Sequence, residues 1–297
     1  MLEFRRITLN DRNKVNKALA FSDFRGCEYT FANNLAWCRL ADSQICFYKD
    51  FYIVCAFGNK DGIPTFILPA GSGDYREVIR EMKLFSERRG NPLRICGVTE
   101  KSLQMFNELF HDGFTAQYDR DGSDYIYLRS DLAELKGKKF HQKRNHLAKF
   151  NRIESEFAMI DEKDFDDCIS FIVSDYNCKI AIETSHSAVA EQYAVNTYFN
   201  NFEELGLKGG IIRINGDIAA VTIGEKLNSD TFCVHIEKAD RSFDGIYTGI
   251  CNKFTNACMA DFTYVNREED LGIDGLRKSK LSYHPVFLLN KYIVNFK

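Results

Sequence analysis

The chain has 297 residues, 45% of them hydrophobic and 27% charged, which is enough apolar material for two globular cores of about 100–200 residues each. The formal net charge is -3, so a strongly basic segment is a local feature rather than a compositional habit. No apolar run approaches the ~20 residues that a membrane-spanning helix needs, and the first ten residues lack the apolar region of a signal peptide. These features predict a cytoplasmic protein, and a peripheral position on a membrane is the alternative.

The ten cysteines are spread along the chain, and no two are spaced as C-x-x-C. A zinc site or redox pair built on that spacing is therefore not expected. Several cysteines lie in apolar runs, where cysteine acts as a small buried hydrophobe. His141 and His146 are five residues apart, which is off the spacing that places two ligands on one helix face. The sequence predicts reduced thiols, no bound metal and no tightly bound cofactor.

Helices and strands alternate in the first half of the chain. Apolar spacing predicts a helix over residues 9–20, and a run rich in Ile, Val, Phe and Tyr predicts a strand over 45–57. The further elements expected in this half are a strand over 63–68, a helix over 74–89, a strand over 93–98, a helix over 99–110, and strands over 114–118 and 124–128.

The second half repeats this order, which suggests two copies of one fold. Asn215-Gly216 between two strands is a strong hairpin signal. The expected elements are helices over 164–176 and 183–205 (the second with a break), strands over 208–214, 217–227 and 230–238, a helix over 245–260, a strand over 262–266, a helix over 275–281 and a last strand over 286–294. We divide the chain into domains 1–134 and 156–297, joined by a connecting helix over 135–155.

Residues 136–152 hold seven Lys/Arg and no acidic residue, so the rest of the chain sums to -10 (-3 minus +7). A basic block of this kind predicts a surface for polyanions such as RNA phosphates or anionic lipid. Phe140, Leu147 and Phe150 form a partial apolar stripe, which predicts a helix docked on a core with its basic side chains facing outwards. A solvated linker helix is the alternative. The candidate polyanion-binding residues are Lys138, Lys139, Lys143, Arg144 and Asn145.

The order of the predicted elements resembles that of the GNAT acyltransferases. It consists of a long strand hairpin, a third strand, a helix, a strand and a further helix. The resemblance implies an α/β (α+β) fold of two GNAT-like domains, each a mixed, mostly antiparallel sheet flanked by helices. It implies acyl transfer, with donor phosphates at a helix N-terminus and a carboxylate that accepts a proton. The family's Q/R-x-x-G-x-G/A corresponds here to a turn that is one residue longer, and a purely structural turn is the alternative. The candidate donor-binding residues of this turn are Arg241, Gly245 and Tyr247.

Two longer strings, residues 136–146 and 264–280, resemble the C-terminal domain of the phosphatidylglycerol lysyltransferases, and Ser282-Tyr283-His284-Pro285 follows the second. The resemblance covers nearly the whole chain and implies a tandem GNAT-like fold, similar to the Fem-type aminoacyltransferases. It implies a transferase that passes an acyl group from aminoacyl-tRNA or acyl-CoA to an amine or hydroxyl. tRNA and an anionic lipid are therefore the expected partners.

Three acidic residues are candidates for accepting the proton of the attacking group. Glu237 alternates with His235 on the predicted third strand of the second half, so the two share a face. Glu268 and Asp270 follow a predicted strand at a turn into a helix, where α/β folds commonly hold sites. These carboxylates are the catalytic candidates.

The same string supplies further donor-binding candidates. Arg277 and Lys280 are three residues apart on a predicted helix and can bind a phosphate or a carboxylate together. Asn266 lies at the end of the preceding strand. An internal salt-bridge network that fixes the turn is the alternative for this string. For the whole chain, the alternative function is a non-catalytic protein that binds nucleic acid or an anionic ligand on the same fold.

Overall fold

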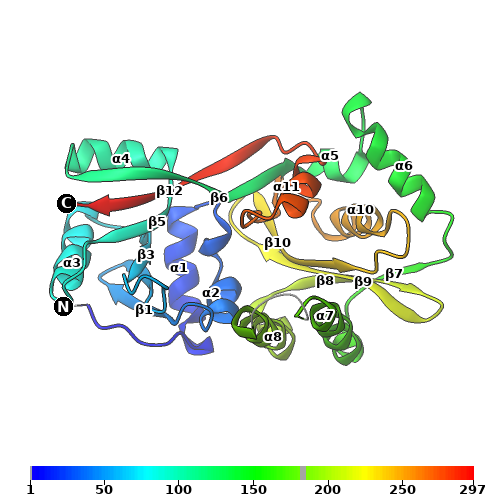
Figure 1. Ribbon diagram of the computed structural model, residues 1–297, viewed down its shortest axis with the longest axis horizontal. Helices are drawn as coiled ribbons and strands as arrows, with labels where there is room; N and C mark the ends of the chain where they lie inside the picture. Colours follow the sequence, from blue (N-terminus) through cyan, green and yellow to red (C-terminus); the bar gives the residue numbers. More distant parts are fainter. Residues whose placement is uncertain (1, 181–184) are drawn as a thin grey trace. The chain divides into compact units, whose positions relative to one another are not determined.

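The structure is a computed structural model that describes residues 2–180 and 185–297, with side chains outside residues 175–188 (Figure 1). Its chain forms two compact units. The first comprises Met1–Asp124, Glu269–Gly272 and Leu288–Lys297, and the second comprises Tyr125–Glu268 and Ile273–Phe287. Both combine a mixed, mostly antiparallel sheet with helices, so the predicted α/β (α+β) class is confirmed.

The first unit contains four helices and a sheet among the described residues. Its elements are α1 (Arg12–Ser22), α2 (Phe31–Trp37), β1 (Ser43–Tyr48), β2 (Phe51–Ala56), β3 (Thr65–Ile67), β4 (Ala70–Gly71), α3 (Tyr75–Glu87), β5 (Arg94–Thr99), α4 (Glu100–Phe110), the first part of β6 (Phe114–Leu128) and nearly all of β12 (Phe287–Phe296). The strands follow the order β1-β2-β3-β5-β12, with β3 and β5 parallel and the other neighbours antiparallel.

The core of the first unit forms where the apolar stripe of α3 packs on this sheet. Val78, Ile79 and Met82 recur at helical spacing on α3 and are each at most 1% exposed. They join Phe66 of β3 and Ile95 of β5, both fully buried, in one apolar cluster. Asp74 caps α3 by accepting a hydrogen bond from the backbone of Arg76, which satisfies a free N–H group of the first turn.

The second unit carries the GNAT-like order that the sequence predicts for its half. Its elements are the end of β6, α5 (Arg129–Glu134), α6 (His141–Phe150), β7 (Glu156–Met159), α7 (Phe165–Ile180), α8 (Ser185–Asn200), α9 (Phe202–Leu205), β8 (Lys208–Ile214), β9 (Asp217–Lys226), β10 (Thr231–Ala239), α10 (Ile246–Cys258), β11 (Tyr264–Asn266) and α11 (Asp274–Leu281). Short 3-10 helices occur in the two units at Leu9–Asp11, Cys27–Tyr29, Lys138–Phe140 and Glu162–Asp164.

Helices cover both faces of the sheet in the second unit. Residues Ala219–Glu225 of β9 are buried in an unbroken run, which indicates a strand enclosed on both sides. Figure 1 shows α10 on one face of β8–β10 and the helices α7 and α8 on the other. The α10 side includes Ile246 and Ile250, which share an apolar cluster with Phe150 at the end of α6. The basic helix is thus docked on the core of this unit.

β10 and β11 are the parallel pair of this unit, and their pairing is short. It covers only Thr231–Cys233 and Tyr264–Asn266, although β10 continues to Ala239. On its other edge β10 pairs antiparallel with β9, and the register shifts between Val234 and Ile236. A bulge of this kind re-aims the side chain at the irregular position, here His235.

Several sequence-based expectations differ from the structure. The run 45–57 is two strands, because Lys49 takes a φ of 53° and turns the chain between β1 and β2. The strands expected over 114–118 and 124–128 are one strand, β6. The helix expected over 183–205 has its predicted break, which lies at Asn201, and its residues 183–184 lie outside the described part of the chain. Neither α5 nor β7 was predicted.

The predicted boundaries at 134 and 155 differ from the two compact units. The last strand was assigned to the second half, but β12 pairs antiparallel with β5 and therefore belongs to the first unit. Because β5 and β12 are far apart in the sequence, no local sequence pattern predicts that they pair. Within the described residues, no helix is both long enough and apolar enough to cross a membrane.

Candidate active site

Two ionic contacts join β10 of the second unit to the residues that follow β11. Glu237 accepts a hydrogen bond from Arg267 at 2.6 Å, and His235 lies 2.8 Å from an oxygen of Glu268. The two residues that share a predicted face of β10 are thus bonded to two consecutive residues after β11. Three of these four were singled out from the sequence; Arg267 lay inside the family-like string but was given no role.

Arg267 is held by aromatic rings as well as by Glu237. Its guanidinium lies 4.6 Å from the centre of the Tyr283 ring and 5.6 Å from that of Tyr127. Its side chain is 11% exposed, and that of Glu237 is 13% exposed. Burial alone would lower the pKa of Arg267, but Glu237, Cys251, Tyr127 and Tyr283 together outweigh it and hold the pKa well above its ordinary value. Arg267 therefore stays charged.

A second cation reaches the same ring from α6. The Nζ atom of Lys143 lies 3.6 Å from the centre of the Tyr283 ring. Burial, with repulsion from the neighbouring Arg267, lowers the pKa of Lys143 from 10.5 to about 8. A lysine with this pKa is a strong hydrogen-bond donor near neutral pH and can lose its proton at modest cost. We call Lys143, Glu237, Arg267 and Tyr283 the cation cluster.

The inward position of Lys143 departs from the prediction that all basic side chains of the block face outwards. Phe140 is fully buried, and Leu147 packs against the apolar cluster of this unit. Lys143 lies three residues after Phe140 and four before Leu147, so helical geometry places it on the same face. The spacing of Phe140, Lys143 and Leu147 could therefore have predicted from the sequence that Lys143 points towards the core.

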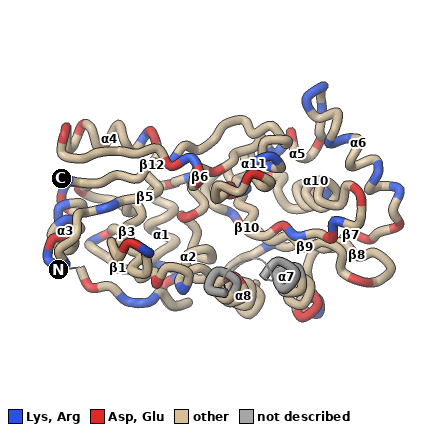
Figure 2. The backbone as a smooth tube through the Cα atoms, in the orientation of Figure 1, with Lys and Arg blue, Asp and Glu red and all other residues tan. Residues whose placement is uncertain are grey.

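The other basic residues of the block divide between structural contacts and the surface. Arg144 donates to the carbonyl oxygens of Leu135 and Gly137 at 2.6 and 2.7 Å, and Lys139 pairs with Asp131 at 2.8 Å. Asn145 contacts His141 at 3.3 Å. Figure 2 shows Lys and Arg gathered along α6 and the segment before it. The exposed basic residues of the block are Lys136, Lys138, Lys139, Arg144, Lys149 and Arg152.

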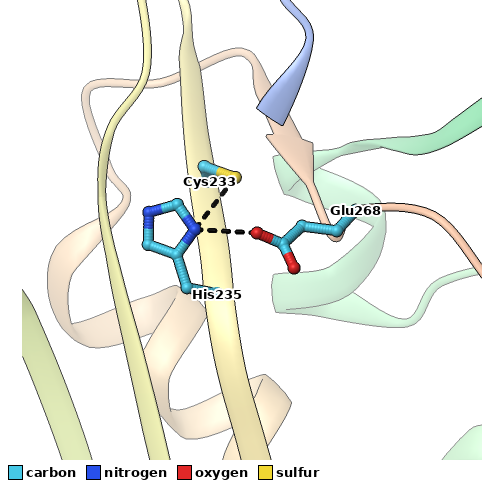
Figure 3. A group of neighbouring side chains, drawn as sticks. All are labelled: Cys233, His235 and Glu268. Atoms are coloured by element: carbon cyan, nitrogen blue, oxygen red, sulfur yellow. Dashed lines mark hydrogen bonds and ion pairs between the residues drawn. The ribbon is translucent and has the colours of Figure 1, made fainter. Parts of the chain in front are cut away.

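His235 links two carboxylates of the second unit. Its Nδ1 faces Glu268 (Figure 3). Its Nε2 lies 3.0 Å from an oxygen of Glu225. The Tyr198 ring stacks on the imidazole with centroids 5.7 Å apart. Burial lowers the pKa of His235, but Tyr198, Cys233 and Glu225 together hold it well above its ordinary value. An imidazole that serves both carboxylates as donor is protonated, which offsets one of their two negative charges.

Glu268 is the most accessible carboxylate of this set. Its side chain is 23% exposed, against 13% for Glu237 and 10% for Glu225. The residue takes a φ of 57°, in the left-handed region that non-glycine residues rarely adopt. The fully buried Asn266 holds that conformation, because its side-chain oxygen accepts from the Glu268 backbone N–H at 2.7 Å. The predicted donor-binding Asn266 therefore positions Glu268 here.

α11 brings Lys280 beside the cation cluster. Its Nζ donates to the carbonyl oxygen of Arg267 at 2.6 Å, and its own carbonyl accepts from the Tyr127 hydroxyl at 2.8 Å. Arg277 lies half-buried on the same helix. The contact of Lys280 fixes the backbone that carries Arg267.

The turn before α10 is shaped by the basic helix. Gly245 takes a φ of 82°, and a Cβ at this position would collide with the carbonyl oxygen of His146 on α6. Asp244 pairs with Lys149 of α6 at 3.0 Å. Arg241 is exposed and Tyr247 half-buried at either end of this turn. Gly245 is thus required for the close approach of α6, and the role in donor binding stays a prediction.

Asp270 belongs to the first unit, whereas the other two carboxylate candidates, Glu237 and Glu268, belong to the second. It is fully buried and accepts from Arg120 at 3.1 Å and from the backbone of Gly272 at 2.9 Å. These contacts fix the turn at 270–272, in line with the structural alternative considered for this string. The catalytic role of Asp270 stays a prediction.

The first unit contains a buried ionic cluster that the sequence did not indicate. Lys291 of β12 lies 2.7 Å from both Asp124 and Glu28, and 3.7 Å from the Cys27 sulfur. Burial lowers the pKa of Lys291, but Asp124, Cys27, Glu28 and Glu269 together hold it well above its ordinary value. Burial raises the pKa of Glu28. The ammonium balances acids that converge from separate stretches of the chain.

Each unit has a GNAT-like fold, and in the second unit acids and bases gather where the parallel pair of β10 and β11 ends. The sequence model of the family described as phosphatidylglycerol lysyltransferase, C-terminal, matches residues 19–295. The chain belongs to this family.

Solved structures share the fold of this chain. A conserved protein of unknown function from Bacteroides thetaiotaomicron VPI-5482 is 38% identical, with a TM-score of 0.93 and full coverage of both chains. L-PGS from Bacillus licheniformis is 14% identical, with a TM-score of 0.67, over 97% of this chain and 92% of its own. FemX is 8% identical, with a TM-score of 0.63, over 98% of this chain and 96% of its own. The last two similarities show the shared fold.

A curated relative, the uncharacterized protein MYCGA3080 of Mycoplasmoides gallisepticum, is 23% identical over 190 residues. The match covers 63% of this chain and spans 58% of the relative's length. The family and the fold point to an acyl- or aminoacyltransferase of the lysylphosphatidylglycerol synthase or Fem type.

Proposed function

We propose that the protein transfers an aminoacyl group from aminoacyl-tRNA to an amine or hydroxyl acceptor at an anionic lipid surface. The observation that carries this proposal is the division of the basic block. Its exposed cations suit a phosphate backbone, while Lys143 reaches inwards to Tyr283 and Arg267. One helix could thus contact the body of a tRNA and the ester at its end.

The cation cluster suits the charge that develops in the reaction. Attack on the ester carbonyl forms a tetrahedral intermediate whose oxygen becomes negative. Preorganised donors in a water-poor site stabilise such an oxyanion far better than water does. Lys143 and Arg267 supply those donors, and Glu237 offsets the charge of Arg267 at 2.6 Å when no substrate is bound.

Proton removal from the acceptor fits Glu268 best. It is the most exposed carboxylate of the set, and the imidazole of His235 links it to Glu225. The acceptor's proton passes to Glu268 as the bond to the carbonyl carbon forms. The ribose oxygen leaves as the tetrahedral intermediate collapses and takes up the proton from Glu268, which is thereby restored as a carboxylate. No covalent enzyme intermediate is needed.

The turn before α10 favours tRNA over acyl-CoA as donor. In the GNAT layout that the sequence resembles, the phosphates of the donor lie at this helix N-terminus. Here the carbonyl oxygen of His146 lies against Gly245, and the Asp244 carboxylate is adjacent. A phosphate at this turn would meet oxygen atoms of partial or full negative charge. We therefore take acyl-CoA as the alternative donor.

The surface around α11 supports an acceptor presented by a membrane. Ile273, Leu276, Leu281 and Val286 are between 36% and 54% exposed, and the basic residues of α11 lie among them. Exposed apolar side chains next to Lys and Arg are typical of segments that lie in the interface of an anionic bilayer. This surface would keep the protein peripheral to the membrane.

Donor binding is tested with tRNA and with CoA at two salt concentrations. Replacing Lys138 and Arg152 by Gln should reduce the salt slope of tRNA binding by about 0.7–0.9 for each phosphate that is no longer neutralised. Lys60→Gln with Lys101→Gln, two exposed lysines of the first unit, is the control with the same change in net charge. Equal slopes in both variants would argue against the basic helix as the tRNA surface, and tight CoA binding without tRNA binding would identify the alternative donor.

Transfer is measured as loss of the aminoacyl ester in the presence of phosphatidylglycerol vesicles. Ile273→Ser with Leu276→Ser should weaken vesicle binding, whereas Leu84→Ser, an exposed leucine of the first unit, should not. Binding of tRNA with no ester loss on any amine or hydroxyl acceptor would instead identify a non-catalytic binding protein.

A further inference from the structure

Cys233, His235 and Glu268 bring a sulfur, a nitrogen and an oxygen together in the second unit. The Cys233 sulfur lies 3.7 Å and the Glu268 oxygen 2.8 Å from Nδ1 of His235, and all three atoms lie within 4.8 Å of one another (Figure 3). Zn²⁺ takes thiolate, imidazole and carboxylate ligands at about 2.0–2.3 Å, in a tetrahedron. The three atoms are close enough together for one ion to contact all of them once the proton between His235 and Glu268 is removed.

The backbone holds these side chains in place from two separate stretches. Cys233 and His235 are alternate residues of β10, so they share a face, and the register shift between Val234 and Ile236 sets the direction of the imidazole. Glu268 comes from the turn after β11, in the left-handed conformation fixed by Asn266. Because the ligands belong to different strands, no spacing motif marked them in the sequence, which predicted no metal.

The contacts around His235 are those of a metal-bound histidine. Its other nitrogen, Nε2, lies 3.0 Å from Glu225, and the Tyr198 ring stacks on the imidazole at 12°. A metal-ligating histidine almost always donates its second N–H to a carboxylate or carbonyl, which fixes the tautomer and aims the free nitrogen. Glu225 performs this task here and directs Nδ1 towards Cys233 and Glu268.

A comparable group in the first unit already contains a cation. Cys27, Asp124 and Glu269 also lie within 4.8 Å of one another. There the Lys291 ammonium is 2.7 Å from Asp124 and 3.7 Å from the Cys27 sulfur, so it occupies the position of an ion. At Cys233 and Glu268, the group between the ligands is the imidazole, which is itself a ligand.

We infer that Cys233, His235 and Glu268 form a Zn²⁺ site with one position open to water or a ligand. The ion would replace the proton that His235 and Glu268 share. The site does not depend on the identity of the acyl donor. An ion on Glu268 would keep that carboxylate from accepting the acceptor's proton, so metal-loaded protein should be inactive in the transfer proposed above.

Titration with Co²⁺, a coloured substitute for Zn²⁺, tests the site without any activity measurement. We expect one equivalent to bind with a thiolate charge-transfer band in the near ultraviolet and with visible bands of a four-coordinate ion. Cys233→Ser should abolish the near-ultraviolet band, whereas Cys251→Ser and Cys258→Ser, two further thiols of the same unit, should leave it unchanged. Glu225→Gln should weaken the affinity by about 10–100-fold.

Two outcomes would overturn the inference: no charge-transfer band at any Co²⁺ concentration up to saturation, or a band that survives Cys233→Ser. If Cys233→Ser does not fold, Glu268→Gln serves instead, because that side chain is partly exposed. It should retain the thiolate band while the Zn²⁺ affinity falls at least 10-fold. Unchanged affinity in Glu268→Gln would also contradict the site.

Discussion

The Nζ atom of Lys143 lies 3.6 Å from the centre of the Tyr283 ring, which places a cation of the basic helix inside the candidate active site. The pKa of this lysine is lowered to about 8. If its ammonium stabilises the oxyanion, the transfer rate should fall as pH rises through about 8. Lys143→Met should lower the rate about 10²–10³-fold, as removal of one oxyanion donor does. The pH–rate profile checks both.

Lys143→Arg is the control for this pH dependence. Arginine keeps its charge at every accessible pH, so the variant should lose the fall above pH 8 even if its rate is lower. A fall that persists unchanged in Lys143→Arg would assign it to another group.

Lys143 also makes stability depend on pH. An unfolded lysine titrates near 10.4, so between about 8 and 10.4 the unfolded state binds more protons than the folded state. The free energy of unfolding should therefore rise with pH across this window in the wild-type protein. Urea denaturation at several pH values should show this rise, and Lys143→Met should remove it. A rise of equal size in Lys143→Met would exclude Lys143 as its source.

Glu268 contacts His235, whereas Glu237 contacts the buried Arg267. Replacing each glutamate by glutamine separates their roles. Glu268→Gln should lower kcat by about 10²–10⁴-fold with little change in KM, because it removes the proposed proton acceptor. Glu237→Gln leaves the buried Arg267 without its anion, so it should lower stability and alter KM more than kcat. Steady-state kinetics with thermal denaturation measures both. The reverse pattern would identify Glu237 as the proton acceptor.

Gly245 and Gly137 both have positive φ values, 82° and 86°, but differ in their surroundings. An alanine at Gly137 meets no atom within 4 Å, whereas one at Gly245 collides with the carbonyl oxygen of His146. Gly137→Ala should therefore cost about 1–3 kcal/mol from backbone strain alone, because its φ of 86° and ψ of 171° are essentially restricted to glycine. Gly245→Ala should cost more, because α6 must move away from α10. Equal costs in urea denaturation would contradict close packing of α6 on this turn.

The buried cluster around Lys291 predicts a large effect on stability. Lys291→Met leaves Asp124 and Glu28 without their cation and should destabilise the protein by about 3–5 kcal/mol. The double variant with Asp124→Asn should cost less than the sum of the two single changes. Lys83→Met is the control, because the Lys83–Glu87 pair is exposed and should contribute only about 0.3–0.5 kcal/mol. Thermal and urea denaturation of the two single variants, the double variant and the control, each compared with the wild type, measures these differences.

Local sequence patterns predicted much of the secondary structure correctly. The Asn215-Gly216 turn joins β8 and β9 as predicted, with both residues at positive φ. The turn at Lys49 was missed because neither it nor its neighbour Asp50 is a glycine or an asparagine, the residues that signal such a turn. A lysine in this conformation is imposed by the pairing of β1 with β2, which no short window of sequence reveals.

The sequence indicated which residues belong to the candidate active site but not which of them are in contact. The family-like strings contained Lys143, Arg267 and Tyr283, but nothing in either string showed that these residues meet. Their meeting depends on α6 docking on α10 and on β11 ending beside β10. Residues that act together through tertiary packing of this kind can be proposed from sequence only one at a time.

The pairing of β12 with β5 has a consequence for biosynthesis. A ribosome delivers Leu288–Lys297 after the whole of the second unit, yet these residues supply a strand of the first unit. The first unit therefore cannot complete its sheet until the second unit has been synthesised, in contrast to the usual N-terminal-first order. A premature stop codon at or before Leu288 would thus disrupt the unit whose synthesis began first.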